Sequence, residues 1–414
     1  MSNDTQPEIR FPGFTDDWEQ RKLKEFGKST GGTSIESEFV EGGKYKVISI
    51  GSYSEQSVYT DQNIRAELTD KTRNRVLNKG DLTMILNDKT ASGNIIGRVL
   101  LIDSNDSYVY NQRTERIEPD HKKYDSQFLY HMLNAPMIRS KIIKQAQGNT
   151  QIYVNWSAIG ELDYLVPNLD EQREIGAFFF NLNNLITLHQ RKLDLLKETK
   201  KGFLQKMFPK NGAKVPEIRF PGFTEDWEER KLSEMAGFSK GNGYSKADLV
   251  EKGHPVILYG RLYTKYETVI EKVDTFAELK EKSVISNGGE VIVPASGETP
   301  EDISRASVVD VSGVALGGDL NIIKTKSELN PTFLALTISN GSQQKEMTKR
   351  AQGKSVVHLH NSDLKEVNLL CPKLDEQVKI GSFFKKLDVA ITLHQRKLDL
   401  LKETKKGFLQ KMFV

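Results

Sequence analysis

Two long segments of the chain carry apolar residues at the alternating three- and four-residue spacing of a helical seam. Acidic residues follow Pro167 and lysines crowd the turns before Pro209, which are typical signals for a helix start and a helix end. The pattern predicts one helix over 171–208, ~57 Å long at about 1.5 Å per residue, and an equally long helix over 376–413. The first seam consists of Ile175, Phe179, Leu182, Ile186, His189, Leu193, Leu196, Lys200, Phe203 and Met207.

The polar members of these seams are His189 and Lys200 in the first segment and His394 and Lys405 in the second. Polar residues at seam positions commonly set the register of paired helices or extend their charged ends to solvent. Metal ligands would need further ligands clustered nearby, so we interpret all four as structural.

The rest of the sequence predicts a mixed α/β structure. Two stretches with helical spacing, 126–148 and 330–353, predict pairs of short helices. Short apolar runs that end near glycine or proline are typical of strands. These runs are 45–51, 80–86, 98–103, 163–167, 255–260, 289–295, 307–311, 321–324 and 367–372.

The chain is an internal duplication. Residues 186–208 recur letter for letter at 391–413, and the opening motif at 7–23 recurs at 216–232 with two changes. The regions between these repeats share only isolated matching residues. Between the counterparts of Gly80 and Ala146, the second half is four residues shorter than the first half. A constant framework with divergent middles suits a molecule that recognises two different targets at a fixed separation.

The duplication completes the expected fold. Two copies related by an approximate two-fold axis would pair their long helices antiparallel. We therefore expect an α+β fold, in which two pseudo-symmetric mixed α/β recognition domains are separated by an antiparallel coiled coil. The expected boundaries are 1–168 for the first domain with its opening motif, 169–215 for the central helix and linker, 216–373 for the second domain, and 374–414 for the last helix.

Composition and charge narrow the functional classes. The sequence has no run of ~18 apolar residues and no signal-peptide pattern at its start, and Cys371 is its single cysteine. These features predict a cytoplasmic protein without a disulfide or a cysteine-based zinc site. The net charge is only +3, so nucleic-acid binding would need clustered basic residues or contacts from a partner.

Motifs for catalysis are weak. A methyltransferase would need a glycine-rich cofactor loop and an Asn/Asp-Pro-Pro-aromatic motif, and neither occurs. The triplet at 353–355, Gly-Lys-Ser, lacks the preceding glycine of a phosphate-binding loop. His358 and His360 would project from one face of a strand, either as a metal pair or as surface residues that contact a target. We therefore expect no catalytic residues.

Three features together resemble a known family. They are the opening motif PEIRFPGFTDDWEQRKL, the Pro-x-Leu-Asp-Glu-Gln junction before each long helix, and the helix end RKLDLLKETKKGFLQKMF. In this arrangement the chain resembles the specificity subunits of bacterial type I restriction-modification systems, and the resemblance covers its whole length.

The resemblance implies a function for each part of the chain. Each middle region would be a target-recognition domain for one half of a split, asymmetric DNA site, and the coiled coil would set the distance between the half-sites. The subunit would have no catalysis or cofactor of its own. It would dock two modification subunits, which methylate adenine with S-adenosylmethionine, and up to two restriction subunits, which use ATP and magnesium. Half-sites about one DNA turn (~34 Å) apart would suit two equivalent readers.

Candidate DNA contacts are side chains suited to base readout, namely Arg or Lys for guanine and Asn or Gln for adenine. Each such side chain, taken singly, also fits a solvated loop. In the first half we select Ser52, Tyr53, Arg73, Arg75, Asn87, Lys89, Thr90, Ser92, Asn94, Arg98, Asn111, Gln112, Arg113, Gln147, Asn149, Gln151 and Tyr153. In the second half we select Arg261, Tyr263, Ser296, Thr299, Arg305, Gln352, Lys354, Ser355, His358 and His360.

The opening motifs carry an aromatic cluster with two interpretations. The cluster would either cap its own domain against the coiled coil or provide exposed anchors for a modification subunit. Its members are Phe11, Phe14, Trp18, Phe220, Phe223 and Trp227.

Two other functions compete with DNA recognition. A coiled-coil scaffold could use the divergent regions to bind proteins, but such modules usually expose apolar patches, whereas these loops are polar. A stand-alone enzyme is disfavoured by the missing motifs.

Overall fold

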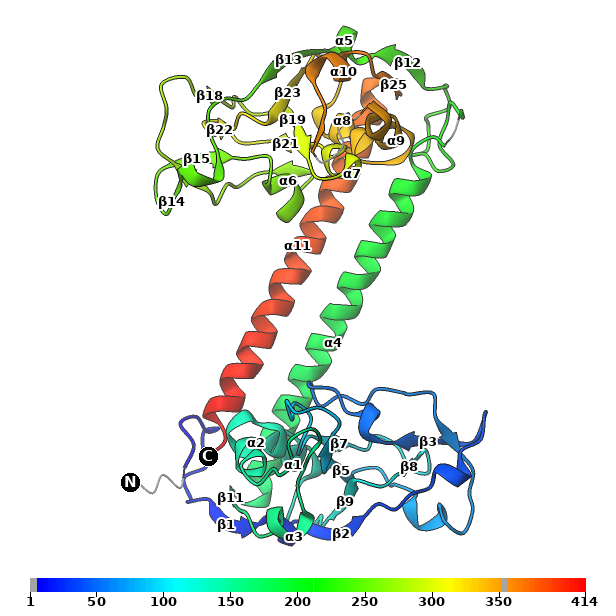
Figure 1. Cartoon of the computed structure of the whole chain (residues 1–414), viewed down its shortest axis with the longest axis vertical. Helices are drawn as coiled ribbons and strands as arrows, with labels where there is room; N and C mark the ends of the chain where they lie inside the picture. Colours follow the sequence, from blue (N-terminus) through cyan, green and yellow to red (C-terminus); the bar gives the residue numbers. More distant parts are fainter. Residues whose placement is uncertain (1–5, 211, 351–355) are drawn as a thin grey trace. The chain divides into compact units, whose positions relative to one another are not determined.

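The computed structural model describes residues 6–210, 212–350 and 356–414, and its chain divides into two compact units (Figure 1). Unit 1 contains the chain up to residue 189 together with 397–414, and unit 2 contains 190–396. Each long helix therefore contributes one part to each unit. Within the described residues, no helix is both long enough and apolar enough to cross a membrane.

Unit 1 is built on two sheets. A four-stranded antiparallel sheet has the order β2-β9-β5-β7, and a three-stranded sheet, β4-β3-β8, contains one parallel pair. The strands are β1 (Glu19–Lys22), β2 (Gly27–Gly31), β3 (Tyr45–Ile48), β4 (Arg65–Ala66), β5 (Leu82–Ile85), β6 (Asn87–Asp88), β7 (Val99–Leu101), β8 (Tyr108–Tyr110), β9 (Thr114–Pro119), β10 (Ile152–Tyr153) and β11 (Asp163–Val166). The helices are α1 (Ser126–Asn134), α2 (Pro136–Ile143) and α3 (Trp156–Ile159).

Unit 2 repeats this plan with two five-stranded sheets, β13-β23-β19-β21-β16 and β14-β17-β15-β22-β18. Its strands are β12 (Glu228–Lys231), β13 (Ala236–Lys240), β14 (Leu249–Val250), β15 (His254–Ile257), β16 (Val269–Ile270), β17 (Phe276–Ala277), β18 (Val284–Ile285), β19 (Glu290–Pro294), β20 (Ser296–Gly297), β21 (Ser307–Val309), β22 (Ala315–Leu316), β23 (Leu320–Thr325), β24 (Val357–His358) and β25 (Asn368–Cys371). Its short helices are α5 (Leu232–Met235), α6 (Arg261–Thr264), α7 (Pro300–Ile303), α8 (Pro331–Ile338), α9 (Gly341–Arg350) and α10 (Asn361–Lys365).

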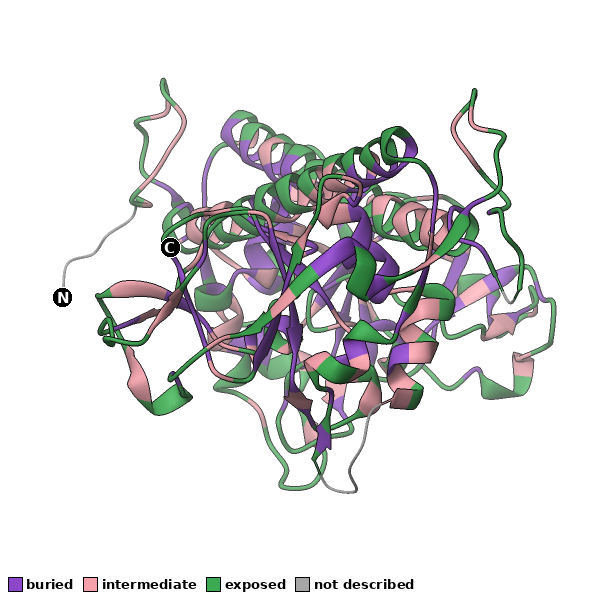
Figure 2. Ribbon diagram, turned by 90° about the horizontal axis from the view of Figure 1, so that it is seen from above, coloured by how far each residue is buried: buried purple, intermediate pink, exposed green. Residues whose placement is uncertain are grey.

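The main core of each unit lies where the sheet β2-β9-β5-β7 of unit 1, or β13-β23-β19-β21-β16 of unit 2, packs against a helix pair. Figure 2 colours the buried residues purple. In unit 1, Phe128 on α1 is fully buried against the sheet strands, and in unit 2 Phe333 on α8 plays the same part. The helix pairs begin with matching N-caps, because the side chains of Asp125 and Asn330 accept hydrogen bonds from the amides of Phe128 and Phe333. The predicted mixed α/β fold is therefore confirmed in both halves.

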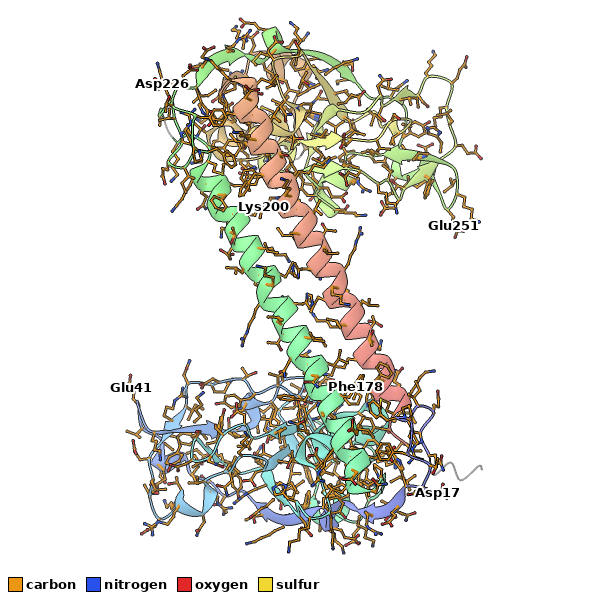
Figure 3. The ribbon with its side chains drawn as sticks, turned by 180° about the vertical axis from the view of Figure 1, so that it is seen from behind. Asp17, Glu41, Phe178, Lys200, Asp226 and Glu251 are labelled. Atoms are coloured by element: carbon orange, nitrogen blue, oxygen red, sulfur yellow. The ribbon has the colours of Figure 1, made fainter. Side chains whose placement is uncertain are left out.

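The long helices are α4 (Leu169–Lys206) and α11 (Leu374–Lys411). The predicted seam is confirmed, since every one of its members is buried or half-buried while most of the remaining surface is exposed, although Met207 lies one residue beyond the end of α4. In unit 1, Phe178 packs against Phe408 with ring centroids 5.0 Å apart. In unit 2, Phe203 packs against Phe383, and Lys200 forms an ion pair with Asp388 (Figure 3 labels Phe178 and Lys200). The helices run antiparallel in each unit.

The junction before each long helix is tied to the opening motif by a buried ion pair. In unit 1 the guanidinium of Arg10 donates two hydrogen bonds, of 2.7 and 2.9 Å, to Glu171, whose side chain has no exposure. Arg219 and Glu376 repeat this pair in unit 2. Glu171 therefore does more than complement the helix dipole, because it anchors the opening segment to α4.

The opening motif also contributes a strand that the sequence pattern did not predict. Strand β1 pairs antiparallel with β11 in unit 1, and β12 pairs with β25 in unit 2. The segment Glu19–Lys22 is highly charged and lacks the apolar alternation of a strand. Its strand conformation depends on hydrogen bonds to a partner more than 130 residues away in the chain.

Candidate nucleic-acid interface

Two loops selected from the sequence meet in unit 1 as a small ribbon. Strand β6 pairs antiparallel with β10, so that Asn87 lies opposite Tyr153. The loop after β5 and the turn around Gly148 therefore lie side by side, although they are far apart in the sequence. Several selected side chains on these segments are exposed, and they are Lys89, Thr90, Ser92, Asn94, Gln147, Asn149, Gln151 and Tyr153.

A third selected loop, between β8 and β9, joins this ribbon at an open groove of about 480 Å³. Lys89, Arg113 and Gln151 line the groove, one from each loop. Arg113 and Gln112 are exposed, and the carboxylate of Glu36 accepts a hydrogen bond from Gln112 on the groove wall. We call this the unit 1 groove. It presents basic and amide side chains to solvent, which are the groups that contact base edges.

The loop that follows β6 is held by internal hydrogen bonds. The Asp88 carboxylate accepts from the amides of Thr90 and Ile95. Burial works to raise the pKa of Asp88, but these donors lower the pKa below its ordinary value. On the other side, Arg139 of α2 donates to the carbonyls of Gly93, Asn94 and Ile96. The loop is therefore a preformed element and not a loose connection.

The sequence pattern does not single out Arg139, because nothing in the α2 segment distinguishes it from a solvated arginine. Burial lowers the pKa of Arg139 to about 10. Its three bonds to loop carbonyls give it a positioning role beneath the exposed side chains of the loop.

Arg113 sits in an unusual backbone conformation, with φ of +65°. A residue with a Cβ rarely adopts the left-handed region, and such strain is concentrated at functional sites. The carbonyl of Arg113 accepts a hydrogen bond from the amide of Leu86, which fixes the turn against the end of β5. The arginine is thereby held at the rim of the groove.

Several candidates of the first half do not lie on the surface. Ser52 has no exposure, Tyr53 packs in a hydrophobic core, and Asn111 is buried against the amide of Ile35. Arg75 is half-buried because it donates to the Gly31 carbonyl and the Tyr110 hydroxyl. Ser52, Tyr53 and Arg75 hold loops in place and do not line the unit 1 groove in this conformation, whereas the buried Asn111 forms part of its wall. The sequence could not separate them from exposed neighbours because serine, tyrosine and asparagine serve both purposes.

The remaining selected residues of unit 1 have intermediate positions. Arg98 is half-buried and donates to the Ser57 hydroxyl. Asn87 is half-buried in the ribbon, and Arg73 is exposed beside Asp70. None of the three lines the unit 1 groove among its described residues.

Unit 2 builds the same ribbon from β20 and β24, with Ser296 opposite His358. The rings of His358 and His360 are exposed and parallel, with centroids 6.2 Å apart. Nowhere in the described chain do three or more potential metal ligands form a cluster. The selected residues Gln352, Lys354 and Ser355 lie outside the described residues.

Other candidates of the second half have structural partners. Arg261 is buried in ion pairs with Glu267 and Asp274, so it holds its own loop together. Thr299 caps α7 by accepting from the amide of Asp302. In this conformation Arg261 is not presented to solvent, because its Nη1 and Nη2 groups donate to Asp274 and Glu267.

Two further candidates of the second half lie at the edges of the ribbon. The hydroxyl of Tyr263 donates to the Ser296 carbonyl at 2.5 Å. Arg305 is half-buried, 3.9 Å from a carboxylate oxygen of Asp302.

The aromatic clusters of the opening motifs pack inside their own units. Trp18 lies in the core against Phe128, and Trp227 lies against Phe333. Phe11 and Phe220 contact Phe178 and Phe383 of the long helices edge-on. The two remaining phenylalanines, Phe14 and Phe223, are half-buried. The tryptophans are not available as surface anchors, and the geometry agrees with the interpretation that the cluster caps its own domain.

Hydrogen-bond register identifies which residues of the two units occupy the same place. The amide of Leu86 donates to the Arg113 carbonyl, and in unit 2 the amide of Ala295 donates to the Asp319 carbonyl. Asp319 is therefore the counterpart of Arg113, and two glycines, Gly317 and Gly318, replace Asn111 and Gln112. The sequence alone does not identify Asp319 as this counterpart, because the two segments have no similarity that would align them.

Comparison with known proteins agrees with this geometry. The model of the type I restriction modification DNA specificity domain matches twice, at residues 15–198 and 224–403. The type I restriction enzyme MjaVIII specificity subunit of Methanocaldococcus jannaschii is 21% identical over 344 residues, which are 80% of this chain and 77% of the relative. The MjaX specificity subunit of the same organism is 23% identical over 330 residues, which are 75% of this chain and 73% of the relative.

A solved structure has the same fold. The crystal structure of the type I restriction-modification system S subunit from M. genitalium matches with a TM-score of 0.64 at 15% identity, and the match covers 99% of both chains. The two matches to the family model together span most of the sequence. This chain belongs to the family of type I restriction-modification DNA specificity proteins.

Proposed function

We propose that this chain is the DNA-recognition subunit of a type I restriction-modification complex, in which each unit recognises one half of a split, asymmetric DNA site. The observation that carries the proposal is the contrast between a repeated framework and divergent exposed loops. Arg113 in unit 1 and Asp319 in unit 2 hold the same backbone position but present opposite charges. The recognition domains are proposed to span residues 1–168 and 216–373.

The exposed side chains match the chemistry of base edges. Arginine donates two hydrogen bonds to guanine, amide side chains pair with adenine, and aspartate accepts from the amino group of cytosine. Unit 1 offers Arg113, Gln112 and Gln151 around its groove. Unit 2 offers Asp319 and the exposed His358. Two units with such different donors and acceptors would recognise different half-sites.

We also propose that the long helices dock two modification subunits and set the distance between the half-sites. Leu188 and its copy Leu393 are 63% and 65% exposed, and Leu195 and its copy Leu400 are each 59% exposed. Large apolar side chains exposed at identical positions of both copies suit two identical partners. In this proposal the partners carry the methyltransferase and endonuclease activities and bind S-adenosylmethionine, ATP and magnesium.

The test is methylation mapping in a host that expresses this chain with a cognate modification subunit. We expect methyladenine at one split, asymmetric DNA motif. A complex that forms but methylates no such motif would contradict the proposal and favour a scaffold that binds proteins.

A further inference from the structure

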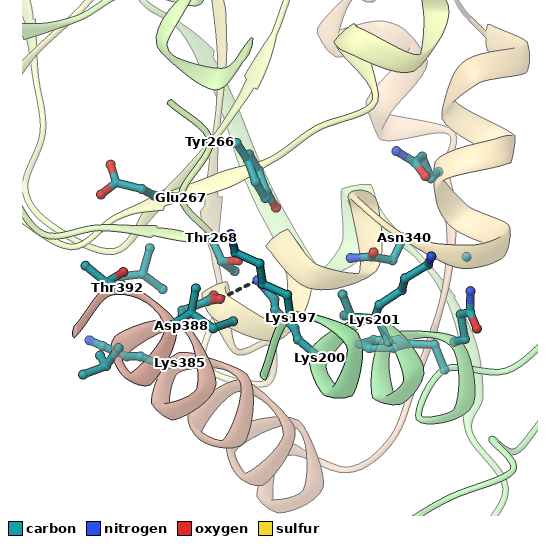
Figure 4. Close-up of a pocket in the computed structure, with 18 of the residues that line it drawn as sticks. Lys197, Lys200, Lys201, Tyr266, Glu267, Thr268, Asn340, Lys385, Asp388 and Thr392 are labelled. Atoms are coloured by element: carbon teal, nitrogen blue, oxygen red, sulfur yellow. Dashed lines mark hydrogen bonds and ion pairs between the residues drawn. The ribbon is translucent and has the colours of Figure 1, made fainter. Parts of the chain in front are cut away.

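Unit 2 contains a second open groove, of about 1350 Å³, between the long helices and the recognition fold (Figure 4). Its walls come from the unit 2 parts of α4 and α11, from the segment 266–272, and from the start of α9. Lys197 and Lys201 lie one helical turn apart on α4 and both line it. Lys345 reaches the groove from α9 and Arg396 from α11. We call this the basic groove.

The groove carries an excess of positive charge. Its described lining includes eight lysine or arginine side chains and three carboxylates. All three carboxylates are already neutralised, because Glu267 pairs with Arg261, Glu271 with Lys385, and Asp388 with Lys200. Five exposed cations have no ion pair among the described residues, and they are Lys197, Lys201, Lys272, Lys345 and Arg396.

The basic groove adjoins the ribbon of unit 2 that carries candidate base contacts. Tyr263 on α6 donates to the Ser296 carbonyl in β20. Three residues later Tyr266 forms part of the groove wall, and its hydroxyl donates to the Ala306 carbonyl. One short segment therefore connects the ribbon with the groove.

We infer that the basic groove binds the phosphate backbone of the DNA that unit 2 recognises. The inference rests on the proposed function, which does not say where unit 2 contacts the phosphate backbone of the DNA. A chain with a net charge of only +3 must concentrate its cations to hold a polyanion. Flexible lysine side chains suit phosphates, whose contacts position the duplex without distinguishing sequence.

The divergence of the groove between the two units argues against a docking site for the modification subunit. Two identical partners would need the same surface in both units. The positions in unit 1 that correspond to Lys345 and Lys385 hold Ser140 and Phe180. Lys345 and Lys385 are thus specific to unit 2, whereas the helix residues Lys197, Lys201 and Arg396 recur in the other copy of the repeated string as Lys402, Lys406 and Arg191.

The repeated helix sequence provides a matched control for the test. The groove variant is Lys197→Gln with Lys201→Gln, and the control is Lys402→Gln with Lys406→Gln, the same change in the identical string of unit 1. Each variant is assembled with the modification subunit, and its affinity for a duplex carrying the mapped site is measured across a range of salt concentrations. A duplex with both half-sites scrambled is measured in parallel.

We expect the groove variant to reduce the slope of log affinity against log salt by ~1.8, about 0.9 for each lost phosphate contact. The control should keep the original slope, and any methylation by the groove variant should remain at the original motif. An unchanged slope in the groove variant, or an equal loss in both variants, would overturn the inference. Failure of the groove variant alone to bind the modification subunit would overturn it in favour of a protein contact.

The experiment separates this inference from the proposed function. A wild-type complex that methylates no split site contradicts the function. In that case the slope of log affinity against log salt on the scrambled duplex still reports the number of phosphate contacts. It therefore tests the groove independently of the proposed function.

Discussion

Unit 1 and unit 2 share the buried contacts that stabilise their fold, and they differ in the exposed side chains near the ribbons. The junction glutamine shows the agreement. Gln172 accepts from the amide of Asp125 and donates to the carbonyls of Lys123 and Pro167. Gln377 makes the corresponding bonds with the amide of Asn330 and the carbonyls of Glu328 and Pro372.

The groove rim shows the difference. The turn that carries Asn111, Gln112 and Arg113 in unit 1 consists of two glycines and Asp319 in unit 2. Side chains that satisfy buried backbone groups cannot change without a large free-energy penalty, whereas exposed side chains can change with little effect on stability. The two units therefore retain one scaffold while their exposed chemistry diverges, and this contrast can be tested at both kinds of site.

The largest effect is expected at the buried ion pair of the junction. Glu171→Gln leaves the guanidinium of Arg10 buried without its carboxylate, which typically costs about 3–5 kcal/mol of stability. Glu376→Gln should have the same effect on unit 2. Hydrogen exchange measured by mass spectrometry should show lost protection in the unit that contains the change.

An exposed glutamate one turn along the same helix, Glu174, supplies the control as Glu174→Gln. Equal loss of protection in both units after either junction change would show that the units do not fold as separate bodies. Loss in neither unit would show that the ion pair is not needed.

The next largest effect concerns a buried carboxyl group at a position where unit 2 has a neutral side chain. Glu115 on β9 is 4% exposed, and burial raises its pKa to about 7. Its counterpart on β23 is the neutral Asn321, which donates to the Leu359 carbonyl. Because the folded-state pKa is raised, the stability of unit 1 should be greatest below the ordinary glutamate pKa and fall as the pH rises to about 7.

Removing the ionisable group should abolish this pH dependence. Glu115→Gln should stabilise unit 1 by up to about 3 kcal/mol at pH 8 and by little at pH 4. Urea unfolding at the two pH values, followed by exchange in peptides of unit 1, provides the measurement. Glu118→Gln on the same strand changes an exposed side chain and should have little effect. A gain of equal size at both pH values would mean that the carboxyl group is not the cause.

A smaller and more selective effect is expected at the groove rim. Arg113→Ala should weaken recognition of the first half-site by about 1–3 kcal/mol, as loss of one bidentate base contact does. Asp319→Ala should affect only the second half-site. The measurement is competition between duplexes in which one or the other half-site carries single substitutions. If either variant loses discrimination at both half-sites equally, the division of recognition between the units is wrong.

The sequence was a good guide to elements whose pattern is local. The long helices have a seam that repeats many times, and the strands β5, β7, β19 and β21 are short apolar runs that the sequence pattern predicted. The more polar strands β2, β9 and β13 of the same sheets were missed. Strand β1 was missed because its residues are charged and its conformation depends on a distant partner. Patterns of polarity report burial on one face of an element, and they carry little information about pairing across the chain.

The candidate site shows the same difference between what local sequence patterns predict and what depends on contacts between distant segments. The sequence selected three loops that the fold brings together, since Lys89, Arg113 and Gln151 line one groove. It could not show that Tyr53 and Arg261 point inward, because residue type alone does not give side-chain direction. It also could not reveal Arg139 or Asp319, since their roles arise from contacts between segments that are distant in the sequence.

The smallest predicted effect tests whether the two copies of the helix seam are equivalent. Lys200 pairs with Asp388 at 2.5 Å in unit 2, and both side chains are largely buried. The corresponding residues in unit 1 are Lys405 and Asn183, and burial lowers the pKa of Lys405. Asn183→Asp should supply the missing carboxylate, raise the pKa of Lys405, and stabilise unit 1 by about 0.2–1 kcal/mol at neutral pH.

This gain should disappear at high pH, because the new pair stabilises the fold only while Lys405 carries its proton. The reverse change in unit 2, Asp388→Asn, should cost at least as much as the new pair contributes, since it leaves a largely buried Lys200 without its carboxylate. Urea unfolding of both variants at neutral and alkaline pH compares them directly. A loss of stability in Asn183→Asp would mean that residue 183 does not face Lys405. The repeated string would then form two different seams, although its residues are identical.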